Sequence, residues 1–204
     1  MSNALLHAGL LDAASEPYRS AGRFAYYFAR GKLRTDPVYR AILELGLLRG
    51  RTRLLDLGCG QGLLTAWLRA AEHCYERGDW PWGWPPAPRT WSMRGIELTT
   101  RDVERAQRAL GSASEVSQAD IRSASFGAPD AVVILDVLHY LDPQEQLEVL
   151  RRVRVALPAR GLLLMRVGDA GAGLRFRYGQ CSDKLVMLLR GHSIVTQHCR
   201  SVAQ

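Results

Sequence analysis

A short apolar run followed at once by three glycines restricts the fold more than any other feature of this sequence. Residues 53–57 read Arg-Leu-Leu-Asp-Leu, and Gly58, Gly60 and Gly62 come directly after them. A run of this length and composition is typical of a buried parallel strand, and glycines behind it allow a tight turn into a helix. The segment therefore predicts the strand–turn–helix unit of an α/β sheet.

Strand and helix patterns alternate through most of the chain. We predict strands at residues 53–57, 92–98, 115–119, 131–137 and 161–167, and helices at residues 63–71, 101–110 and 143–156. Such alternation favours an α/β fold with a doubly wound, mainly parallel sheet.

The 204 residues predict a single domain, with an N-terminal helical cap at residues 1–50 and a core at residues 51–204. Apolar residues recur at helical spacing within residues 17–49, and Asp36-Pro37 marks the start of a second helix there. After a helical stretch at residues 174–189, the tail at residues 191–204 shows no convincing pair of strands. The C-terminus is therefore expected to be short, and an open edge on the last strand would favour a homodimer or else leave the fold marginally stable.

Residues 75–91 interrupt the alternation with four tryptophans and four prolines. The proline density excludes a regular helix in this segment. Two interpretations remain open, a surface loop held down by its own tryptophans and a lid over an aromatic substrate.

Charge and composition restrict the partners. The 27 Lys and Arg exceed the 20 Asp and Glu, which gives a net charge of +7, but no block of five or six like charges occurs. Nucleic acid is therefore disfavoured, whereas an acidic protein or an anionic substrate fits the charge. With no apolar stretch of about 20 residues and no signal peptide, we expect a soluble, cytoplasmic protein. The four cysteines form no C-x-x-C pair and no Asp/Asn cluster suits magnesium, so no metal is expected.

The position of the third glycine and the end of the strand distinguish between cofactors. The dinucleotide pattern Gly-x-Gly-x-x-Gly, counted from Gly58, requires a glycine where this chain has Leu63. The strand also carries Asp56, whose carboxylate would repel a pyrophosphate and suits a cationic group. NAD is disfavoured on both grounds.

The pattern Asp56-x-Gly58-x-Gly60-x-Gly62 resembles the first motif of the class I methyltransferases that depend on S-adenosylmethionine (SAM). The resemblance implies a Rossmann-like fold and SAM as cofactor. It also implies that this loop, Cys59 included, faces the amino-acid part of SAM, and that Asp56 holds the ammonium group directly or through water.

Later acidic residues extend the resemblance. It implies that Glu97 accepts hydrogen bonds from both ribose hydroxyls, with Leu98 beside it, and that Asp120 and the Ile121 amide meet the adenine. It further implies that Asp136 lies beside the methionine part and the transferable methyl. Glu97 lies further beyond Gly62 than the roughly 20 residues of the analogous dinucleotide fold, and the Trp/Pro insertion accounts for the excess. Capping of the next helix is the alternative role for each acid.

Residues 17–33, 132–141 and 164–169 resemble bacterial methyltransferases encoded with aryl polyene pigment synthesis, of the xanthomonadin type. This resemblance implies methylation of a hydroxylated aryl head group, carried on an acyl carrier protein. Such carriers are acidic, so the net charge of +7 is compatible with one.

His139 is the one histidine expected near the methyl, and it is the candidate general base for a phenol. The alternative is that it only shapes the pocket. Tyr140 is a second pocket candidate. From the N-terminal cap, Arg30 is a candidate for the SAM carboxylate and Lys32 for the substrate, although both suit a solvated helix end equally. Tyr27 is also a substrate candidate, and its helical spacing favours core packing instead.

Two other functions remain open. The short C-terminus favours a non-catalytic, SAM-binding accessory subunit, and an NAD-dependent oxidoreductase is the third hypothesis. The sequence leaves open whether the acceptor atom is oxygen or a ring carbon.

Overall fold

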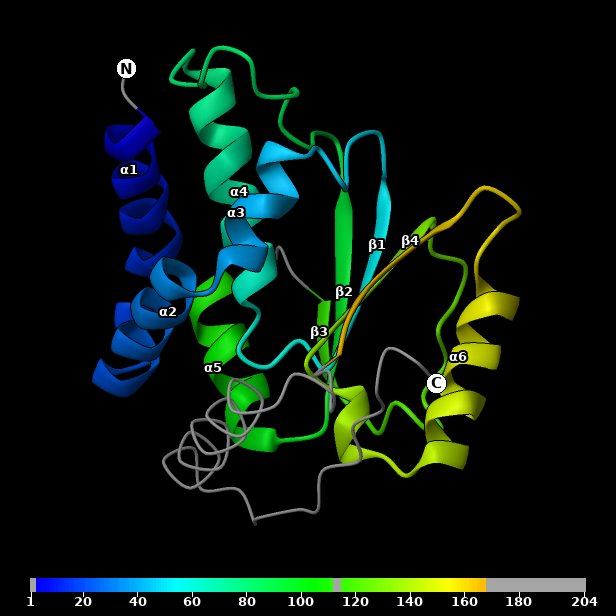
Figure 1. Ribbon diagram of the computed structural model, residues 1–204. Coiled ribbons are helices and arrows are strands. Elements are labelled where there is room, and N and C mark those ends of the chain that lie inside the picture. Colours follow the sequence, from blue (N-terminus) through cyan, green and yellow to red (C-terminus); the bar gives the residue numbers. More distant parts are fainter. Residues whose placement is uncertain (1–2, 112–114, 168–204) are drawn as a thin grey trace, which may run out of the picture.

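The computed structural model of this chain describes residues 3–111 and 115–167, and the statements below concern those residues. The strands form one sheet in the order β3-β2-β1-β4-β5, and every neighbouring pair runs parallel (Figure 1). They are β1 (Arg53–Leu57), β2 (Ser92–Glu97), β3 (Glu115–Gln118), β4 (Ala131–Leu135) and β5 (Leu162–Arg166). The predicted Rossmann-like α/β fold with a doubly wound parallel sheet is confirmed.

The first strand occupies the centre of the sheet. Leu57 pairs with Ile96 of β2 on one side, and Leu54 pairs with Ala131 of β4 on the other. The strand order reverses at this point, because the chain moves outward from β1 to β3 and then returns to the other side of β1. Ligands of open α/β sheets bind at such a reversal, beyond the carboxyl ends of the strands, where the glycine loop lies.

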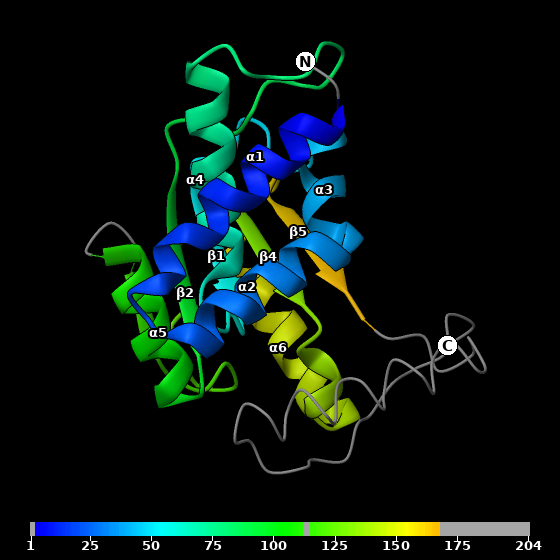
Figure 2. The ribbon, with the colours of Figure 1, turned by 90° about the vertical axis from the view of Figure 1, so that its left-hand side faces the viewer.

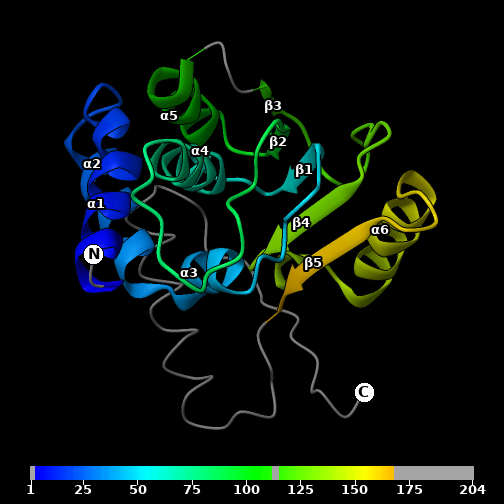
Figure 3. The ribbon, with the colours of Figure 1, turned by 90° about the horizontal axis from the view of Figure 1, so that it is seen from above.

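Helices cover both faces of the sheet. They are α1 (Asn3–Ser15), α2 (Arg23–Thr35), α3 (Pro37–Glu44), α4 (Leu63–Glu76), α5 (Thr100–Leu110) and α6 (Pro143–Ala156), with short 3-10 turns η1 (Glu16–Arg19) and η3 (Leu138–Tyr140). Seen from above, α4 and α5 lie on one side of the sheet and α6 on the other (Figure 3). Figure 2 shows α1 and α2 outside α4.

Alternate residues of the strands enter two separate apolar clusters. Leu54 and Val133 join the cluster beneath α4, whereas Leu55 and Val132 join the cluster beneath α6. This is the period of two that a strand imposes on its side chains. Both faces of the central strands are therefore buried, and the strand ends are left as the place where a ligand can approach.

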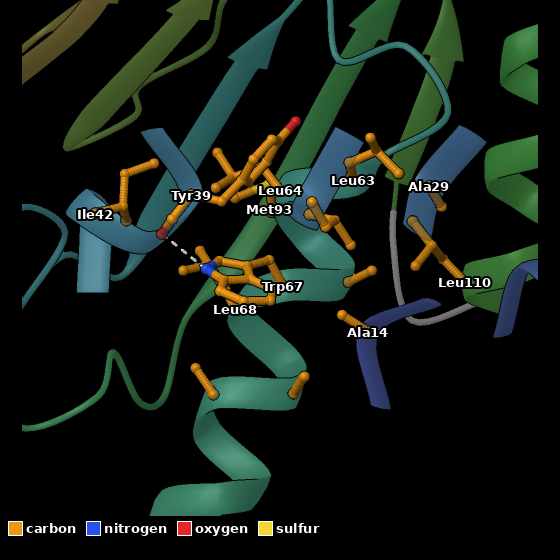
Figure 4. Packing of buried hydrophobic residues seen from close by; sticks show 14 of the residues in the cluster. Ala14, Ala29, Tyr39, Ile42, Leu63, Leu64, Trp67, Leu68, Met93 and Leu110 are labelled. Atoms are coloured by element: carbon orange, nitrogen blue, oxygen red, sulfur yellow. Dashed lines mark hydrogen bonds between the residues drawn. The ribbon is translucent and has the colours of Figure 1, made fainter. Parts of the chain in front are cut away.

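Trp67 of α4 joins the N-terminal helices to the sheet (Figure 4). Its side chain is fully buried, and its Nε1–H donates to the carbonyl oxygen of Tyr39 in α3 at 2.8 Å. Ala14 of α1 and Ala29 of α2 belong to the same cluster. The first helix was not among the predicted elements.

The predicted helix starts at Asp36-Pro37 and at Pro143 are confirmed. Asp36 caps α3 by accepting the Val38 N–H at 3.1 Å, and Asp142 caps α6 in a reciprocal capping box with Glu145. Proline follows each cap, where its missing N–H costs no helical hydrogen bond.

The Trp/Pro insertion lies at the opposite end of the sheet from the glycine loop, because it connects the end of α4 to the beginning of β2 (Figure 1). The indole Nε1–H of Trp80 donates to the Pro85 carbonyl at 2.9 Å, and its ring packs edge-on against Trp84. The interpretation as a surface loop held by its own tryptophans is confirmed for these two, whereas Trp82 is fully exposed. The position of the insertion disfavours the interpretation as a substrate lid, because ligands of open α/β sheets bind at the carboxyl ends of the strands.

The predicted helix at residues 174–189 and the tail at residues 191–204 lie outside the described residues. Within the described sheet, β5 is an edge strand, and Leu163 and Met165 on one of its faces are exposed. Dimerisation through this edge stays a prediction. In residues 3–111 and 115–167, no helix combines the length and apolar character needed to cross a membrane.

Candidate cofactor-binding site

The loop after β1 depends on glycine for its backbone conformation. Gly58, Gly60 and Gly62 have φ values of 74°, 56° and 77°, in the left-handed region that other residues rarely adopt. A Cβ at Gly58 would overlap the side chain of Val137, and one at Gly62 would lie 2.5 Å from Leu110 Cδ1. The spacing of the motif thus reflects both positive φ and close packing.

Glu97 at the end of β2 supports this loop. Its Oε2 accepts the N–H of Gly60 at 2.9 Å, and its Oε1 accepts the N–H of Thr99 at 2.9 Å. The side chain is buried, yet each carboxylate oxygen can accept a further hydrogen bond. Glu97, the residue predicted to bind the ribose, therefore lies directly against the glycine loop.

Asp56 is a second buried acid beside Glu97. Burial and then the negative charge of Glu97 raise the pKa of Asp56 to about 7. A cation bound nearby would favour the ionised carboxylate and lower this pKa again. The two acids at the carboxyl ends of β1 and β2 therefore form a site that favours a positively charged ligand.

Cys59 lies in the glycine loop, between Gly58 and Gly60. Its side chain packs onto β2, where a Cβ at Gly95 would lie 2.6 Å from Cys59 Sγ. Burial raises the pKa of the Cys59 thiol. The Cys59 N–H donates to the Ile96 carbonyl oxygen at 3.2 Å, and the Cys59 carbonyl oxygen accepts the Gly62 N–H at 2.9 Å, so Cys59 helps to hold the shape of the loop.

The N-terminal helices hold the loop from its other side. The Tyr18 hydroxyl donates to the carbonyl oxygen of Gln61 at 2.9 Å, and Gln61 Nε2 donates to the carbonyl oxygen of Ala25 at 2.9 Å. Tyr18 and Gln61 are both buried. The sequence carried no signal for these two hydrogen bonds.

On the β3 side, of the two residues predicted to contact the adenine, Asp120 lies in an ion pair and Ile121 in an apolar cluster. Asp120 pairs with Arg122 at 2.6 Å, and this hydrogen bond holds the pKa of Asp120 below its ordinary value. Ile121 is buried in the apolar cluster beneath α6. Leu98 is 62% exposed and offers an apolar surface directly after Glu97.

On the β4 side, Asp136 is bound by two cations. The Arg166 Nε donates to Asp136 Oδ1 at 2.8 Å, and Lys32 Nζ lies 3.6 Å from Asp136 Oδ2. Arg166 was not among the predicted site residues. Its sequence signal is a lone cation that ends an otherwise apolar strand.

Some of the remaining predicted site residues lie near the end of β4, and the others lie on the surface. His139 is buried in η3 after β4, and its ring centroid lies 4.1 Å from that of Tyr140. Of the two predicted cations, Lys32 reaches Asp136, whereas Arg30 pairs with Asp12 of α1 at 2.5 Å. Tyr27 is 63% exposed, so the interpretation that it packs in the core is wrong.

Among the described residues, no three His, Cys, Asp or Glu side chains gather as ligands for a metal ion.

Comparison with known proteins agrees with this geometry. Residues 55–163 match the methyltransferase domain family. Carboxy-S-adenosyl-L-methionine synthase from Chromohalobacter salexigens is 27% identical over 143 residues, which cover 65% of this chain and 48% of that protein.

Two solved structures share the fold. One is an O-methyltransferase family protein from Burkholderia thailandensis, with a TM-score of 0.60, 18% identity, and coverage of 91% of this chain and 53% of the other. The second is an O-methyltransferase from neocarzinostatin biosynthesis, in complex with SAM and 2-hydroxy-5-methyl naphthoic acid. Its TM-score is 0.56 at 22% identity, with coverage of 94% of this chain and 51% of the other.

This chain spans about half the length of each of these proteins. The family match covers more than half of this chain and includes the last three residues of β1, the glycine loop, β2, β3, β4 and the beginning of β5. The predicted cofactor, SAM, is the cofactor of that family, and the chain belongs to the methyltransferase domain family.

Proposed function

We propose that this protein transfers the methyl group of SAM to a hydroxylated aryl substrate. The observation that carries the proposal is the pair of buried acids, Asp56 and Glu97, at the glycine loop. SAM carries an ammonium group on its methionine part and a diol on its ribose, on either side of the sulfonium centre, and carboxylates suit both groups. Bound there, SAM supplies a sulfonium methyl group that a nucleophile attacks, with S-adenosylhomocysteine as the leaving group.

Each side of the loop has a distinct task in this proposal. Asp56 faces the ammonium group, Glu97 accepts hydrogen bonds from the ribose hydroxyls, and Leu98 offers apolar surface to the adenine. Glu97 keeps its hydrogen bond to Gly60 while it binds, because each carboxylate oxygen has two lone pairs. The protein thus orients the donor with groups that are already fixed in place, and alignment is the main source of rate in a displacement of this kind.

His139 is the proposed general base. It is buried in η3, which directly follows the β4 edge where Asp136 lies. A phenol must lose its proton as its oxygen attacks the methyl carbon, and a neutral imidazole accepts that proton. The products are the aryl methyl ether, S-adenosylhomocysteine and a protonated His139, which returns its proton to solvent. Tyr140 packs on the His139 ring and is placed to orient it.

Two observations support an aryl acceptor. The sequence resembles methyltransferases of aryl polyene pigment synthesis in three segments. The O-methyltransferase of neocarzinostatin biosynthesis, which shares the fold, binds a hydroxylated naphthoic acid. An acidic carrier protein that presents the aryl group as a thioester suits the net charge of +7.

Titration with SAM and S-adenosylhomocysteine tests the cofactor, and turnover of labelled SAM with hydroxybenzoyl thioesters tests the acceptor. We expect both ligands to bind and one thioester to gain the mass of a methyl group. His139→Gln should abolish most turnover and preserve SAM binding, while His73→Gln, at an exposed position in the last turn of α4, serves as the control. A folded protein that binds neither ligand overturns the proposal. Binding without turnover on any hydroxyaryl acceptor favours the accessory subunit instead.

A further inference from the structure

Arg166, at the end of β5, binds two carboxylates from distant parts of the sequence. Its Nη1 and Nη2 donate to Asp36 at 2.5 and 2.7 Å, and its Nε and Nη2 donate to Asp136. Asp36 precedes α3, and Asp136 follows β4. A guanidinium can hold two carboxylates at once because its N–H donors form a planar fork. Arg166 therefore joins the N-terminal helices to the edge of the candidate site.

Lys32 of α2 completes this group of charges. Its Nζ lies 2.8 Å from Asp36 Oδ2 and 3.6 Å from Asp136 Oδ2. Burial opposes the ionisation of Asp36, but hydrogen bonds from Arg166 and Lys32 outweigh burial and hold the pKa of Asp36 well below its ordinary range. Two cations thus balance two anions, and the Asp36 side chain stays ionised at neutral pH although it is only 7% exposed.

Asp136 has a backbone conformation that residues other than glycine rarely adopt. Its φ is 58°, which costs on the order of 1 kcal/mol and persists only where neighbouring groups impose it. Arg166 is such a neighbour, because its carbonyl oxygen accepts the Asp136 N–H at 3.2 Å while its side chain binds the carboxylate. The main chain and the side chain of Arg166 therefore hold the same turn.

The next residue transmits this constraint to the glycine loop. Val137 packs so closely on Gly58 that a Cβ at position 58 would overlap it. A shift of the turn at Asp136 would therefore open a gap beside Gly58 or press into the loop.

We propose that Arg166 is a positioning residue for SAM. It holds the turn at Asp136 and Val137 against the glycine loop, and through Asp36 it fixes the start of α3 to the same turn. This inference rests on the proposed function, because it makes Arg166 responsible for the shape of the site that receives SAM. Arg166 acts through its neighbours and needs no contact with the cofactor.

The test compares Arg166→Met, Arg166→Lys, Asp36→Asn and the double variant Asp36→Asn/Arg166→Met. Asparagine keeps the capping of α3, so Asp36→Asn removes only the charge. Arg40→Met is the matched control, because Arg40 pairs with Glu44 within the same helix α3 at 2.6 Å. The affinity for SAM is measured by titration, well below the thermal unfolding temperature of each variant.

We expect Arg166→Met to weaken SAM binding roughly tenfold. Arg166→Lys should recover thermal stability but not affinity, because an ammonium cannot hold two carboxylates in a fork. The double variant should lose no more affinity than Arg166→Met alone, and Arg40→Met should bind as the wild type does. A purely structural role would change the unfolding temperature and leave the affinities equal.

Wild-type affinity in Arg166→Met overturns this inference and leaves the proposed function in place. If Arg166→Met does not fold, unchanged affinity in both Arg166→Lys and Asp36→Asn overturns it. A wild-type protein that does not bind SAM overturns the proposed function, and this inference with it.

Discussion

The carboxylate of Glu97 and the backbone N–H of Gly60 form a hydrogen bond of 2.9 Å across 37 positions of sequence. The same carboxylate also accepts the Thr99 N–H at 2.9 Å, so one side chain fixes both the glycine loop and the turn that leads into α5. A ligand that binds Glu97 therefore meets a group whose position is already set.

Removal of this carboxylate should weaken SAM binding. We expect Glu97→Ala to raise the dissociation constant roughly 10- to 100-fold, because hydrogen bonds to a charged group are lost and the loop loses its support. Glu97→Gln should fall between Ala and wild type, since the amide keeps one acceptor oxygen. Glu104→Ala on the exposed face of α5 is the control. Titration of the three variants checks the order, and equal affinity of Glu97→Ala and wild type would contradict it.

The raised pKa of Asp56 predicts that SAM affinity depends on pH. The ammonium group requires the ionised carboxylate, and the pKa of Asp56 without ligand is about 7. Below that pH, binding must displace a proton, so the affinity should fall by up to about tenfold for each unit of pH. Above it, the affinity should level off.

Titrations across this range check the prediction, with 5′-methylthioadenosine as the control ligand. This compound lacks the amino-acid part of SAM, so its affinity should change little across the same range. Asp56→Asn should lose the pH dependence together with most of the affinity for SAM. A SAM affinity that is flat through pH 7 would show that Asp56 does not face the ammonium group.

The same pKa predicts how the stability of the ligand-free protein depends on pH. The folded pKa of about 7 lies above the ordinary value of 3.8, so the folded state binds the proton more tightly than the unfolded state does. The stability that this group contributes is fully present below the ordinary value and is lost as the pH rises through about 7. Denaturant unfolding of wild type and Asp56→Asn, each below the ordinary pKa and above pH 7, measures how much free energy of unfolding is lost between the two pH values. This loss should be larger for wild type.

Gly58 should tolerate alanine less well than Gly50 does. Both have positive φ, 74° and 72°, which costs alanine about 1 kcal/mol in either place. A Cβ at Gly50 meets nothing within 4 Å, whereas one at Gly58 overlaps Val137. Gly58→Ala should therefore lower the free energy of unfolding by roughly 1–3 kcal/mol more than Gly50→Ala. Denaturant titration measures both, and equal losses would mean that Val137 moves aside freely.

Replacement by alanine should change the free energy of unfolding little at Trp82 and much at Trp67. Trp82 is fully exposed on the insertion, and Trp67 is fully buried in α4. We expect Trp82→Ala to change the free energy of unfolding by less than about 0.5 kcal/mol and to leave SAM affinity unchanged. Trp67→Ala should lose about 3–5 kcal/mol. Weaker SAM binding in Trp82→Ala would revive the interpretation of the insertion as a lid.

The sequence predicted the features that depend on local chemistry. The apolar run at β1 and the three glycines after it have few alternatives, and the proline that follows each of Asp36 and Asp142 fixes a helix start. The alternation of strands and helices then indicates a doubly wound, mainly parallel sheet.

Features that depend on contacts between distant residues were not predicted. The bond from Tyr18 to Gln61 and the pair of Arg166 with Asp36 join residues 43 and 130 positions apart. No periodicity in one segment encodes such partners. The first helix was missed because its sequence is apolar almost all round and lacks the alternation of polar and apolar faces that marks an amphipathic helix.

The location of the Trp/Pro insertion also makes it a suitable place to insert a tag. Its tip is a turn in which the Trp84 N–H donates to the Pro81 carbonyl, with Gly83 at positive φ, and it is solvent-exposed at the end of the sheet remote from the glycine loop. Exposed turns of this kind accept inserted peptides best. An affinity tag or a fluorescent reporter placed between Trp82 and Gly83 would lie far from the glycine loop, so the protein could be immobilised or labelled while the proposed SAM site stays open.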